Sequence, residues 1–247
     1  MQLGPTCKVS ICTPTKNRAA ALPILAECIK NQSYPKELIE WVVVDDSDSP
    51  IEPLLNSINP EVDIKYQFFD KSLPIGRKRN ISSEMSSGEI IVNFDDDDFY
   101  PVDRISHAVE SLQSSEFYVA GCSIVPILFI KERSLWISSS FGNNHAIAST
   151  FAFKKELLEL TEYNNSDTYA EERFFLKDYN LNLVKLDPFK TVVSIAHSSN
   201  TVNKYNIVSQ SEGVPISFAP YKEIFELTKS QREIIDELAD VYGCLLS

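Results

Sequence analysis

Glycine is scarce in this chain, and no two glycines are separated by a single residue. The 247 residues contain seven glycines, and the turn that follows the first apolar segment has none. Dinucleotide-binding folds hold phosphates in a glycine-rich first loop with G-x-G spacing. The missing spacing excludes a Rossmann dehydrogenase. The glycine-free first turn disfavours a sugar nucleotidyltransferase, which stays open as an alternative.

Cysteine pairs and long apolar runs are missing as well. The five cysteines show no C-x-x-C spacing, so neither a zinc site nor a redox motif is predicted. The longest nearly apolar run, Tyr118 to Ile130, is 13 residues long, whereas a membrane-spanning helix needs about 20. Residues 1–8 are short and polar where a secretion signal would be apolar. We therefore expect a soluble, cytoplasmic protein with no transmembrane segment.

Basic residues are outnumbered by acidic ones, with 23 Lys and Arg against 35 Asp and Glu and a net charge of −12. Nucleic acids and anionic membranes bind through exposed basic clusters, so neither is an expected partner. A hydrophobic content of 43% and a charged content of 23% are those of a globular protein. One local basic patch around an anionic ligand remains compatible with this composition.

The front half of the sequence alternates strand and helix patterns. Apolar runs predict strands over residues 9–13, 39–44, 64–69 and 90–94. Apolar residues at helical spacing predict helices over 22–29, 77–86 and 102–112, with Pro23 in the first turn of the first one. This order predicts an α/β fold with a mixed, mainly parallel central sheet flanked by helices.

The back half has shorter elements and no internal repeat. We expect strands over 117–125 and 127–130, the second forming a hairpin with 135–137, and short strands over 151–153, 183–186 and 192–196. Helices are expected over 154–160, 169–179 and 223–238. The simplest account is a single domain over 1–247, with a front half over 1–122, a back half over 123–215 and a helical segment over 216–247.

Four aspartates, Asp95 to Asp98, directly follow the strand predicted over 90–94. In extended chain, Asp95 and Asp97 would share one face and Asp96 and Asp98 the other. Paired carboxylates repel each other unless a cation lies between them, and Mg²⁺ or Mn²⁺ prefers oxygen ligands and can also bind phosphates. Because open α/β sheets bind ligands beyond their strand ends, we expect a metal-diphosphate site here. The alternative is a solvated acidic turn.

The helix predicted over 77–86 begins with Arg77, Lys78 and Arg79. Basic side chains at a helix start oppose the helix dipole, so they contribute little to stability there. They are well placed if a phosphate-bearing ligand approaches that end of the helix. The alternative is a solvated basic surface.

Five segments resemble, in order and spacing, the family 2 inverting glycosyltransferases. They are residues 9–18 (VSICTPTKNR), 31–35 (NQSYP), 42–47 (VVVDDS), Gly76 with Arg79 and Asn80, and 88–91 (GEII) running into Asp95 to Asp98. The resemblance spans roughly the first 105 residues. It implies the GT-A fold, a UDP-, GDP- or dTDP-sugar donor, a glycan or other hydroxyl acceptor, and Mn²⁺ or Mg²⁺ as cofactor.

For the donor site, the resemblance implies that Asp46 accepts hydrogen bonds from the base or ribose. A capping or turn role is the alternative for Asp46. Arg79, with Arg77 as a second candidate, would face the diphosphate. The end of the first strand would lie against the nucleotide, through Thr13, Pro14 and Thr15.

For the metal, the resemblance implies that Asp95 and Asp97 form the D-x-D pair, with Asp97 in direct contact. Asp96 would lie near the donor sugar or ribose, while Asp98 would cap the next helix. His197 belongs to a late His-x-x-Asn segment that resembles one near the metal or diphosphate in relatives. A surface or core histidine is the alternative reading of His197.

For catalysis, the family places a Glu-Asp pair at the start of a helix, and Glu171 and Glu172 stand at the corresponding place. Glu172 falls on the general-base position, where a carboxylate is chemically adequate. The alternative is an ordinary acidic first helical turn. Asn144 and His145 are candidates for the acceptor pocket or for a plain polar loop.

The resemblance as a whole implies an inverting, metal-dependent hexosyl- or deoxyhexosyltransferase. Residues 1–122 would bind the nucleotide sugar, and residues 123–215 the acceptor. A non-catalytic nucleotide-sugar-binding protein is the alternative from another functional class.

Overall fold

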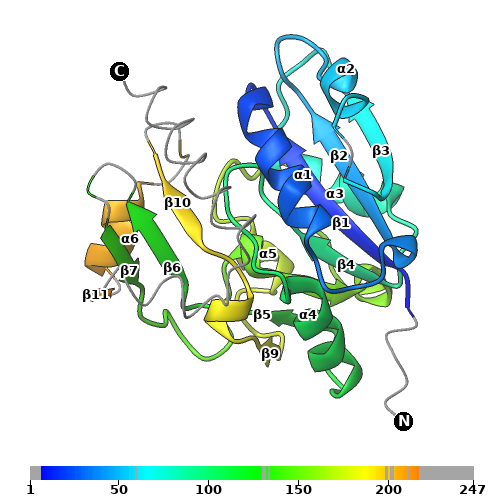
Figure 1. The fold of residues 1–247 in the computed structure, drawn as a ribbon. Coiled ribbons are helices and arrows are strands. Elements are labelled where there is room, and N and C mark those ends of the chain that lie inside the picture. The colour runs from blue at the N-terminus through cyan, green and yellow to red at the C-terminus, as the bar shows by residue number, and fades with distance from the viewer. Residues whose placement is uncertain are drawn as a thin grey trace.

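The computed structural model describes residues 7–58, 60–129, 132, 134–197, 200, 203–210 and 212–216. Within these residues a seven-stranded sheet has the order β3-β2-β1-β4-β8-β5-β9 (Figure 1). Its strands are β1 (Val9–Thr15), β2 (Ile39–Asp45), β3 (Asp63–Phe68), β4 (Ile90–Asn93), β5 (Val119–Gly121), β8 (Ala152–Lys154) and β9 (Val184–Lys185). β1, β2, β3 and β4 are parallel, while β8 runs antiparallel to β4 and β5. The predicted α/β class with a mainly parallel sheet is confirmed.

The central strands are buried on both faces, as their continuous apolar runs predict. One face carries Ile11, Trp41 and Val43, which pack in one core cluster with α1 (Leu22–Lys30) and α4 (Arg104–Gln113). The opposite face carries Val42 and Ile91, which belong to a second cluster with aromatic residues of the back half. Figure 1 shows α1 lying across the front of β1 and β2.

Helix α3 (Ile75–Met85) differs from the other helices because its buried side is mostly polar. It begins two residues before the predicted start and packs against β1 and β2. The polar side chains that it buries are Lys78, Arg79, Asn80, Ser82 and Ser83. Buried charged groups need partners, so this face of α3 identifies a polar site at the end of the sheet.

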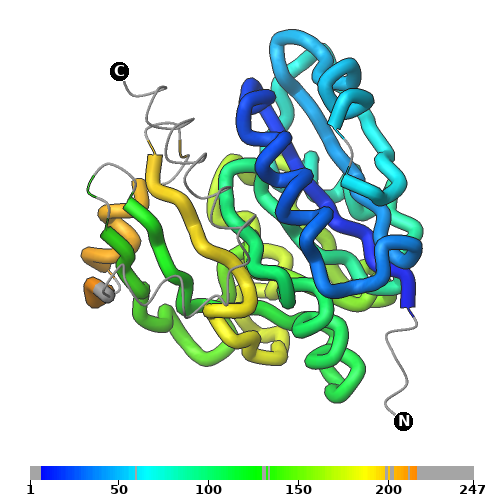
Figure 2. Tube along the Cα trace, viewed as in Figure 1, coloured from blue at the N-terminus to red at the C-terminus, as the bar shows by residue number. Residues whose placement is uncertain are grey.

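The back half contains a second sheet with the order β10-β6-β7-β11. Its strands are β6 (Pro126–Phe129), β7 (Ser134–Ile137), β10 (Ser194–Ala196) and β11 (Val214–Ile216). β6 and β7 pair antiparallel, which confirms the predicted hairpin. Figure 2 shows this sheet beside the main one, with α6 (Lys204–Gln210) next to it. The shorter elements are η1 (Ala19–Ala21), η2 (Lys36–Leu38), α2 (Glu52–Leu55), η3 (Ala148–Thr150), η4 (Lys155–Glu159) and η5 (Pro188–Lys190).

Three elements of the back half are shorter in the structure than the sequence predicts. The helix expected over 169–179 is one turn, α5 (Glu172–Phe175). It is interrupted by residues with positive φ, at Ala170 before it and at Lys177, Asp178 and Tyr179 after it. The helix expected over 154–160 is the 3-10 segment η4, and the strand expected over 117–125 is reduced to β5.

The helix expected over 223–238 lies outside the described residues, as does nearly all of the segment 216–247. In the part of the chain that is described, no helix has the length and apolar character needed to cross a bilayer.

Candidate active site

A cavity of about 750 Å³ opens beyond the carboxyl ends of β1 and β4. It is lined by the loop after β1, the start of α3, the aspartate run after β4, and α5. This is the edge at which open α/β sheets bind ligands. Eleven of the lining side chains are charged: Lys16, Arg18, Lys78, Arg79, Asp95, Asp96, Asp97, Asp98, Glu171, Glu172 and Lys204.

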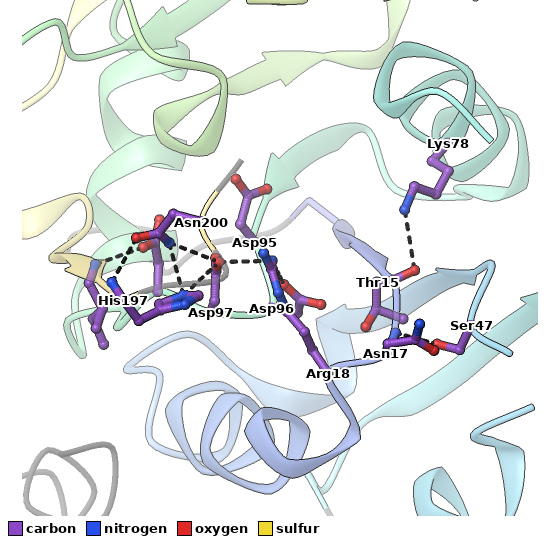
Figure 3. A network of polar contacts seen from close by, with 12 residues as sticks. Thr15, Asn17, Arg18, Ser47, Lys78, Asp95, Asp96, Asp97, His197 and Asn200 are labelled. Carbon is purple, nitrogen blue, oxygen red and sulfur yellow. Dashed lines mark hydrogen bonds and ion pairs between the residues drawn. The ribbon is translucent and has the colours of Figure 1, made fainter. Parts of the chain in front are cut away.

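The aspartate run forms a turn after β4, so its carboxylates do not alternate as predicted. Asp96 Oδ1 and Asp97 Oδ2 both lie 2.8 Å from Nη1 of Arg18. Because the chain turns back on itself, neighbours that an extended strand would separate converge on one guanidinium. Figure 3 shows Arg18 reaching these two carboxylates from the loop after β1.

The loop after β1 is shaped to direct Arg18 inward. Asn17 has φ 54°, a left-handed conformation that Asn tolerates better than most residues. Its backbone N–H donates to Oγ of Ser47 at 2.7 Å, and its side-chain oxygen accepts from the N–H of Asp48 at 3.0 Å. These bonds fasten the loop after β1 to the loop after β2. Arg18 is therefore held over the sheet edge.

Asp97 also contacts the late histidine segment. Its Oδ2 lies 3.0 Å from Nε2 of His197 and 3.3 Å from Nδ2 of Asn200. Burial alone would raise the pKa of Asp97, but the hydrogen bond with His197 and the charge of Arg18 lower it well below its usual range. His197 and Asp97, both predicted for the metal site, are thus in direct contact (Figure 3).

Asp98 does not cap the next helix, contrary to the prediction. Its Oδ1 accepts from Oγ of Ser194 at 3.1 Å and from the backbone N–H of Ile195 at 3.0 Å. Burial raises its pKa to about 7. Helix α4 begins later, at Arg104, because Pro101 and the turn after it separate the helix from the acidic run. Asp98 thus links the turn to β10 and to the segment that carries His197.

Arg79 connects the aspartate run after β4 with the glutamate Glu171 beside α5. It is buried, with Nε 2.7 Å from Oε1 of Glu171 and Nη2 3.0 Å from Oδ1 of Asp95. Burial opposes its charge, yet these carboxylates hold its pKa well above the usual value. A permanently charged guanidinium is therefore fixed beside the aspartate run.

Arg77 does not face the cavity, which corrects the prediction for this residue. Its side chain is 41% exposed and its nearest carboxylate is Glu84, 3.6 Å away. Successive helical residues point about 100° apart, so Lys78 takes the inward direction instead. Lys78 Nζ lies 2.7 Å from Oδ1 of Asp46 and 3.3 Å from the carbonyl oxygen of Thr15.

Asp46 lies one layer behind the cavity wall in this structure, rather than on it. Its Oδ1 accepts from Lys78, and its Oδ2 accepts from the backbone N–H of Leu73 at 2.7 Å. Both Lys78 and Leu73 line the cavity. Asp46 therefore positions two lining residues, and the predicted contact with a base or ribose requires one of these bonds to open.

The three residues at the end of β1, Thr13 to Thr15, differ in whether they reach the cavity. Pro14 lines the cavity. Thr13 points into the core, where its Oγ1 accepts from Nε1 of Trp41 at 2.9 Å, because alternate strand residues face opposite sides. Thr15 is buried, and its carbonyl oxygen accepts from Lys78. A direct nucleotide contact by Thr13 does not fit this geometry.

Glu171 and Glu172 have different environments although they are neighbours. Glu171 is buried and paired with Arg79. Glu172 lines the cavity, and no ion pair is found for it among the described residues. Burial, reinforced by the negative charge of Glu171, raises the pKa of Glu172 to about 7. A carboxylate with this pKa is suited to accept a proton near neutral pH.

Of the two acceptor-pocket candidates, His145 lines the cavity and Asn144 does not. Nδ1 of His145 lies 2.8 Å from Oγ of Ser123, which directs the ring inward. Asn144 sits in the turn before it, and its side chain is not part of the lining. The prediction for Asn144 is therefore not matched by its position.

Three basic lining residues were not singled out by sequence reasoning, namely Lys16, Arg18 and Lys204. Lys16 and Arg18 stand inside a segment that carries the resemblance, so their position was a usable signal. Lys204 follows a region of weak pattern and had no such signal.

The described residues contain no group of three Asp, Glu, His or Cys side chains arranged to hold a metal ion. Mg²⁺ commonly binds through one or two carboxylates when phosphate oxygens complete its shell. Asp95 and Asp97 line the cavity, with side-chain exposures of 26% and 11%. These hard oxygen donors fit a divalent ion that shares a phosphate ligand.

Comparison with known proteins agrees with this geometry. Residues 10–180 match the sequence profile of Glycosyl transferase family 2. The chain belongs to that family. It is 30% identical over 119 residues to YwdF of Bacillus subtilis (strain 168), described as an uncharacterized glycosyltransferase. That match covers 48% of this chain and 43% of YwdF, so the chain aligns with less than half of that relative.

Two solved GT-A structures share the fold at low sequence identity. TarS 1-349 of S. aureus with UDP-GlcNAc has a TM-score of 0.63 and 19% identity, covering 96% of this chain and 73% of that one. The mannosyltransferase PcManGT of Pyrobaculum calidifontis, with GDP-Man and Mn²⁺, has a TM-score of 0.63 and 17% identity. That similarity covers 98% of this chain and 76% of PcManGT. The predicted GT-A fold is confirmed.

Proposed function

We propose that this family 2 protein is a metal-dependent, inverting glycosyltransferase that uses a nucleoside-diphosphate sugar. One observation carries the proposal: a cavity places Glu172, with a pKa of about 7, in the same space as Arg79, Asp95 and Asp97. The bound UDP-GlcNAc of TarS and GDP-Man of PcManGT support a hexose donor on either nucleotide. The acceptor is proposed to be a hydroxyl of a glycan or another molecule.

The donor would enter between the loop after β1 and the start of α3. Pro14 and Leu73 supply apolar surface there, and Lys78 supplies a positive charge fixed by Asp46. Arg79 would face the diphosphate from the opposite side of the aspartate run. A buried guanidinium does not need to reorganise when negative charge develops, so it stabilises the leaving group efficiently.

Asp97 and Asp95 would hold a divalent metal, with His197 beside Asp97. When bound, such an ion supplies Lewis-acid stabilisation of the charge that builds on the departing diphosphate. The Mn²⁺ in the PcManGT structure supports this use of the site. Asp96 would remain ion-paired with Arg18, near the donor sugar.

Glu172 would act as the general base. It would remove the proton of the acceptor hydroxyl while that oxygen attacks the anomeric carbon from the face opposite the diphosphate. The new carbon–oxygen bond forms as the bond to the diphosphate breaks, so a single displacement inverts the configuration. Glu171 would not compete for the proton, because its pairing with Arg79 occupies it.

The test is calorimetric titration of UDP- and GDP-sugars with Mn²⁺, followed by measurement of nucleoside diphosphate release. We expect donor binding that requires Mn²⁺, and turnover that Asp97→Ala abolishes. Glu172→Gln should bind donor like the wild type but release no product. Asp63→Ala, which removes an exposed carboxylate from the edge strand β3, is the matched control.

Two outcomes separate the alternatives. Heat on titration without any release of nucleoside diphosphate in the wild type would indicate a nucleotide-sugar-binding protein. Metal-dependent activity near wild type in Asp97→Ala would overturn the metal assignment.

A further inference from the structure

The geometry points to an aromatic platform at the cavity mouth, and we propose that it binds the pyranose ring of a glycan acceptor. The platform consists of Phe141 and His145, which line the cavity, and of Tyr179, which packs against His145, with Tyr169 beside the same opening. This inference rests on the proposed function, and it names the acceptor class that the function leaves open.

The platform is a row of neighbouring rings that are tilted against one another, by 47° between Phe141 and His145 and by 38° between His145 and Tyr179. The ring centroids of Phe141 and His145 are 5.3 Å apart, and those of His145 and Tyr179 are 5.1 Å apart. Phe141, His145 and Tyr169 line the cavity together with Glu172. Phe141 is 43% exposed and Tyr169 is 67% exposed. Exposed aromatic side chains at a cavity mouth leave apolar ring faces in contact with water, which a ligand can cover.

The loop that carries Phe141 and His145 is fastened from below by one buried hydroxyl. Ser123 Oγ accepts from the backbone N–H of Phe141 at 2.8 Å and lies 2.8 Å from Nδ1 of His145. Both residues are thus held on the same anchor. A ring surface that is fixed before the ligand arrives loses less conformational entropy on binding.

The third ring is held by strained backbone. Lys177, Asp178 and Tyr179 have φ values of 51°, 54° and 63°, and none of them is glycine. Left-handed conformations of such residues cost about 1 kcal/mol or more each, and they concentrate at functional sites. The turn brings Tyr179 against His145 just after α5, where it supports that ring, packs on the second core cluster and does not itself line the cavity. Burial raises the pKa of Tyr179, and the charge of Glu172 adds to this effect.

The order of strands separates the platform from the donor side. Pro14 and Lys78 belong to the part of the cavity at the ends of β1 and β2. The loop of residues 141–145 leads into η3 and β8, on the other side of β4, and Tyr179 precedes β9. Glu172 lies on this second side. A ligand on the platform therefore lies where a hydroxyl nucleophile would meet the base.

A pyranose ring suits this surface better than an acyl chain does. Its C–H faces are apolar and can cover an aromatic ring, while its edge hydroxyls can bond to lining groups such as Tyr169, His145 and Glu172. The mixture of exposed rings and polar groups at the opening matches that two-sided chemistry.

The experiment measures binding of methyl glycopyranosides and chito-, malto- and cello-oligosaccharides to the donor-loaded protein by saturation-transfer NMR, and the acceptor KM. Sorbitol, a polyol without a ring, and octanol, an alkyl alcohol, are the comparison ligands. We expect ring protons of a pyranoside to show the strongest transfer. Phe141→Ala and Tyr179→Ala should each raise the acceptor KM about tenfold, whereas Tyr179→Phe should keep it low because the ring remains.

The matched control is Phe174→Ala, which removes a ring that is 52% exposed on α5 but does not line the cavity. Donor affinity, measured by calorimetry, tests the proposed function separately. If donor binds and is turned over but no pyranoside binds, or if Phe141→Ala and Tyr179→Ala behave like Phe174→Ala, the platform assignment is wrong. Stronger transfer to octanol than to any pyranoside would also overturn it.

Discussion

The raised pKa of Glu172 gives the most direct test of the proposed mechanism. Moving the pKa of a glutamate from its usual 4.5 to about 7 means that the cavity disfavours the charged form by about 3 kcal/mol. Burial is the main cause, and the charge of Glu171 is the second. The carboxylate that results is a stronger base than an ordinary glutamate, while it remains largely ionised above neutral pH.

The sign of the pH dependence follows from the role of the group. A general base must be deprotonated, so kcat/KM for the acceptor should rise with pH below about 7 and level off above it. The rate at pH 6 should be about one-tenth of the plateau, and at pH 5 about one-hundredth. The assay is transfer at saturating donor and Mn²⁺, measured from pH 5 to 9.

Two variants isolate Glu172 from the other titrating groups, among which Asp96 and Asp98 also have raised pKa values. Glu172→Gln should lower the rate by about 10²–10⁴ and remove its dependence on this pKa. Glu171→Gln should move the midpoint to lower pH, because a like charge beside Glu172 is lost. Glu162→Gln, an exposed glutamate outside the cavity, is the control. A flat wild-type profile, or an unchanged profile in Glu172→Gln, would refute the assignment.

Two further predictions concern the architecture around the base. Arg18→Gln removes the guanidinium that neutralises Asp96 and Asp97, so the affinity for Mn²⁺ without nucleotide should rise by about tenfold or more. Electron paramagnetic resonance measures this affinity, and Lys16→Gln in the same cavity is the control. An unchanged affinity in Arg18→Gln would contradict the reasoning. A Cβ at Gly76 would lie 2.1 Å from the carbonyl oxygen of Asn164, so Gly76→Ala should displace the loop that precedes Glu171. This substitution should cost about 1–3 kcal/mol of stability and so lower the melting temperature. Ser166→Ala in that loop should leave the melting temperature unchanged, and an equally unchanged Gly76→Ala would show that the contact is not tight.

The front half of the fold could be predicted because its strands are buried on both faces and read as uninterrupted apolar runs. The direction of individual side chains could not be predicted. On helix α3, which packs against β1 and β2, Lys78 faces the cavity and Arg77 faces solvent. The aspartate run looks like the continuation of a strand, but it turns, because its carboxylates gain Arg18 and the backbone of β10 as partners.

The back half was harder to predict for a different physical reason. Its elements are short, so few residues carry each periodic pattern. The left-handed turn at Lys177 to Tyr179 contains no glycine or asparagine, which are the usual sequence signals for such backbone. Backbone hydrogen bonds back to α5 close this turn, with the N–H of Asp178 donating to the carbonyl oxygen of Arg173, and the ring of Tyr179 also contacts that of His145.

The charge balance of the cavity explains why donor and metal should bind together. Five basic side chains and six carboxylates line the cavity. Some of the basic groups are already paired: Arg18 with Asp96 and Asp97, and Arg79 with Asp95 and Glu171. A diphosphate that entered alone would add negative charge to a lining that has no excess of positive charge. A divalent cation held by Asp97 would add positive charge to this lining, and it would also compensate the carboxylate if Arg18 moved away. Because coupling between two ligands is reciprocal, the factor by which the metal strengthens donor binding must equal the factor by which the donor strengthens metal binding.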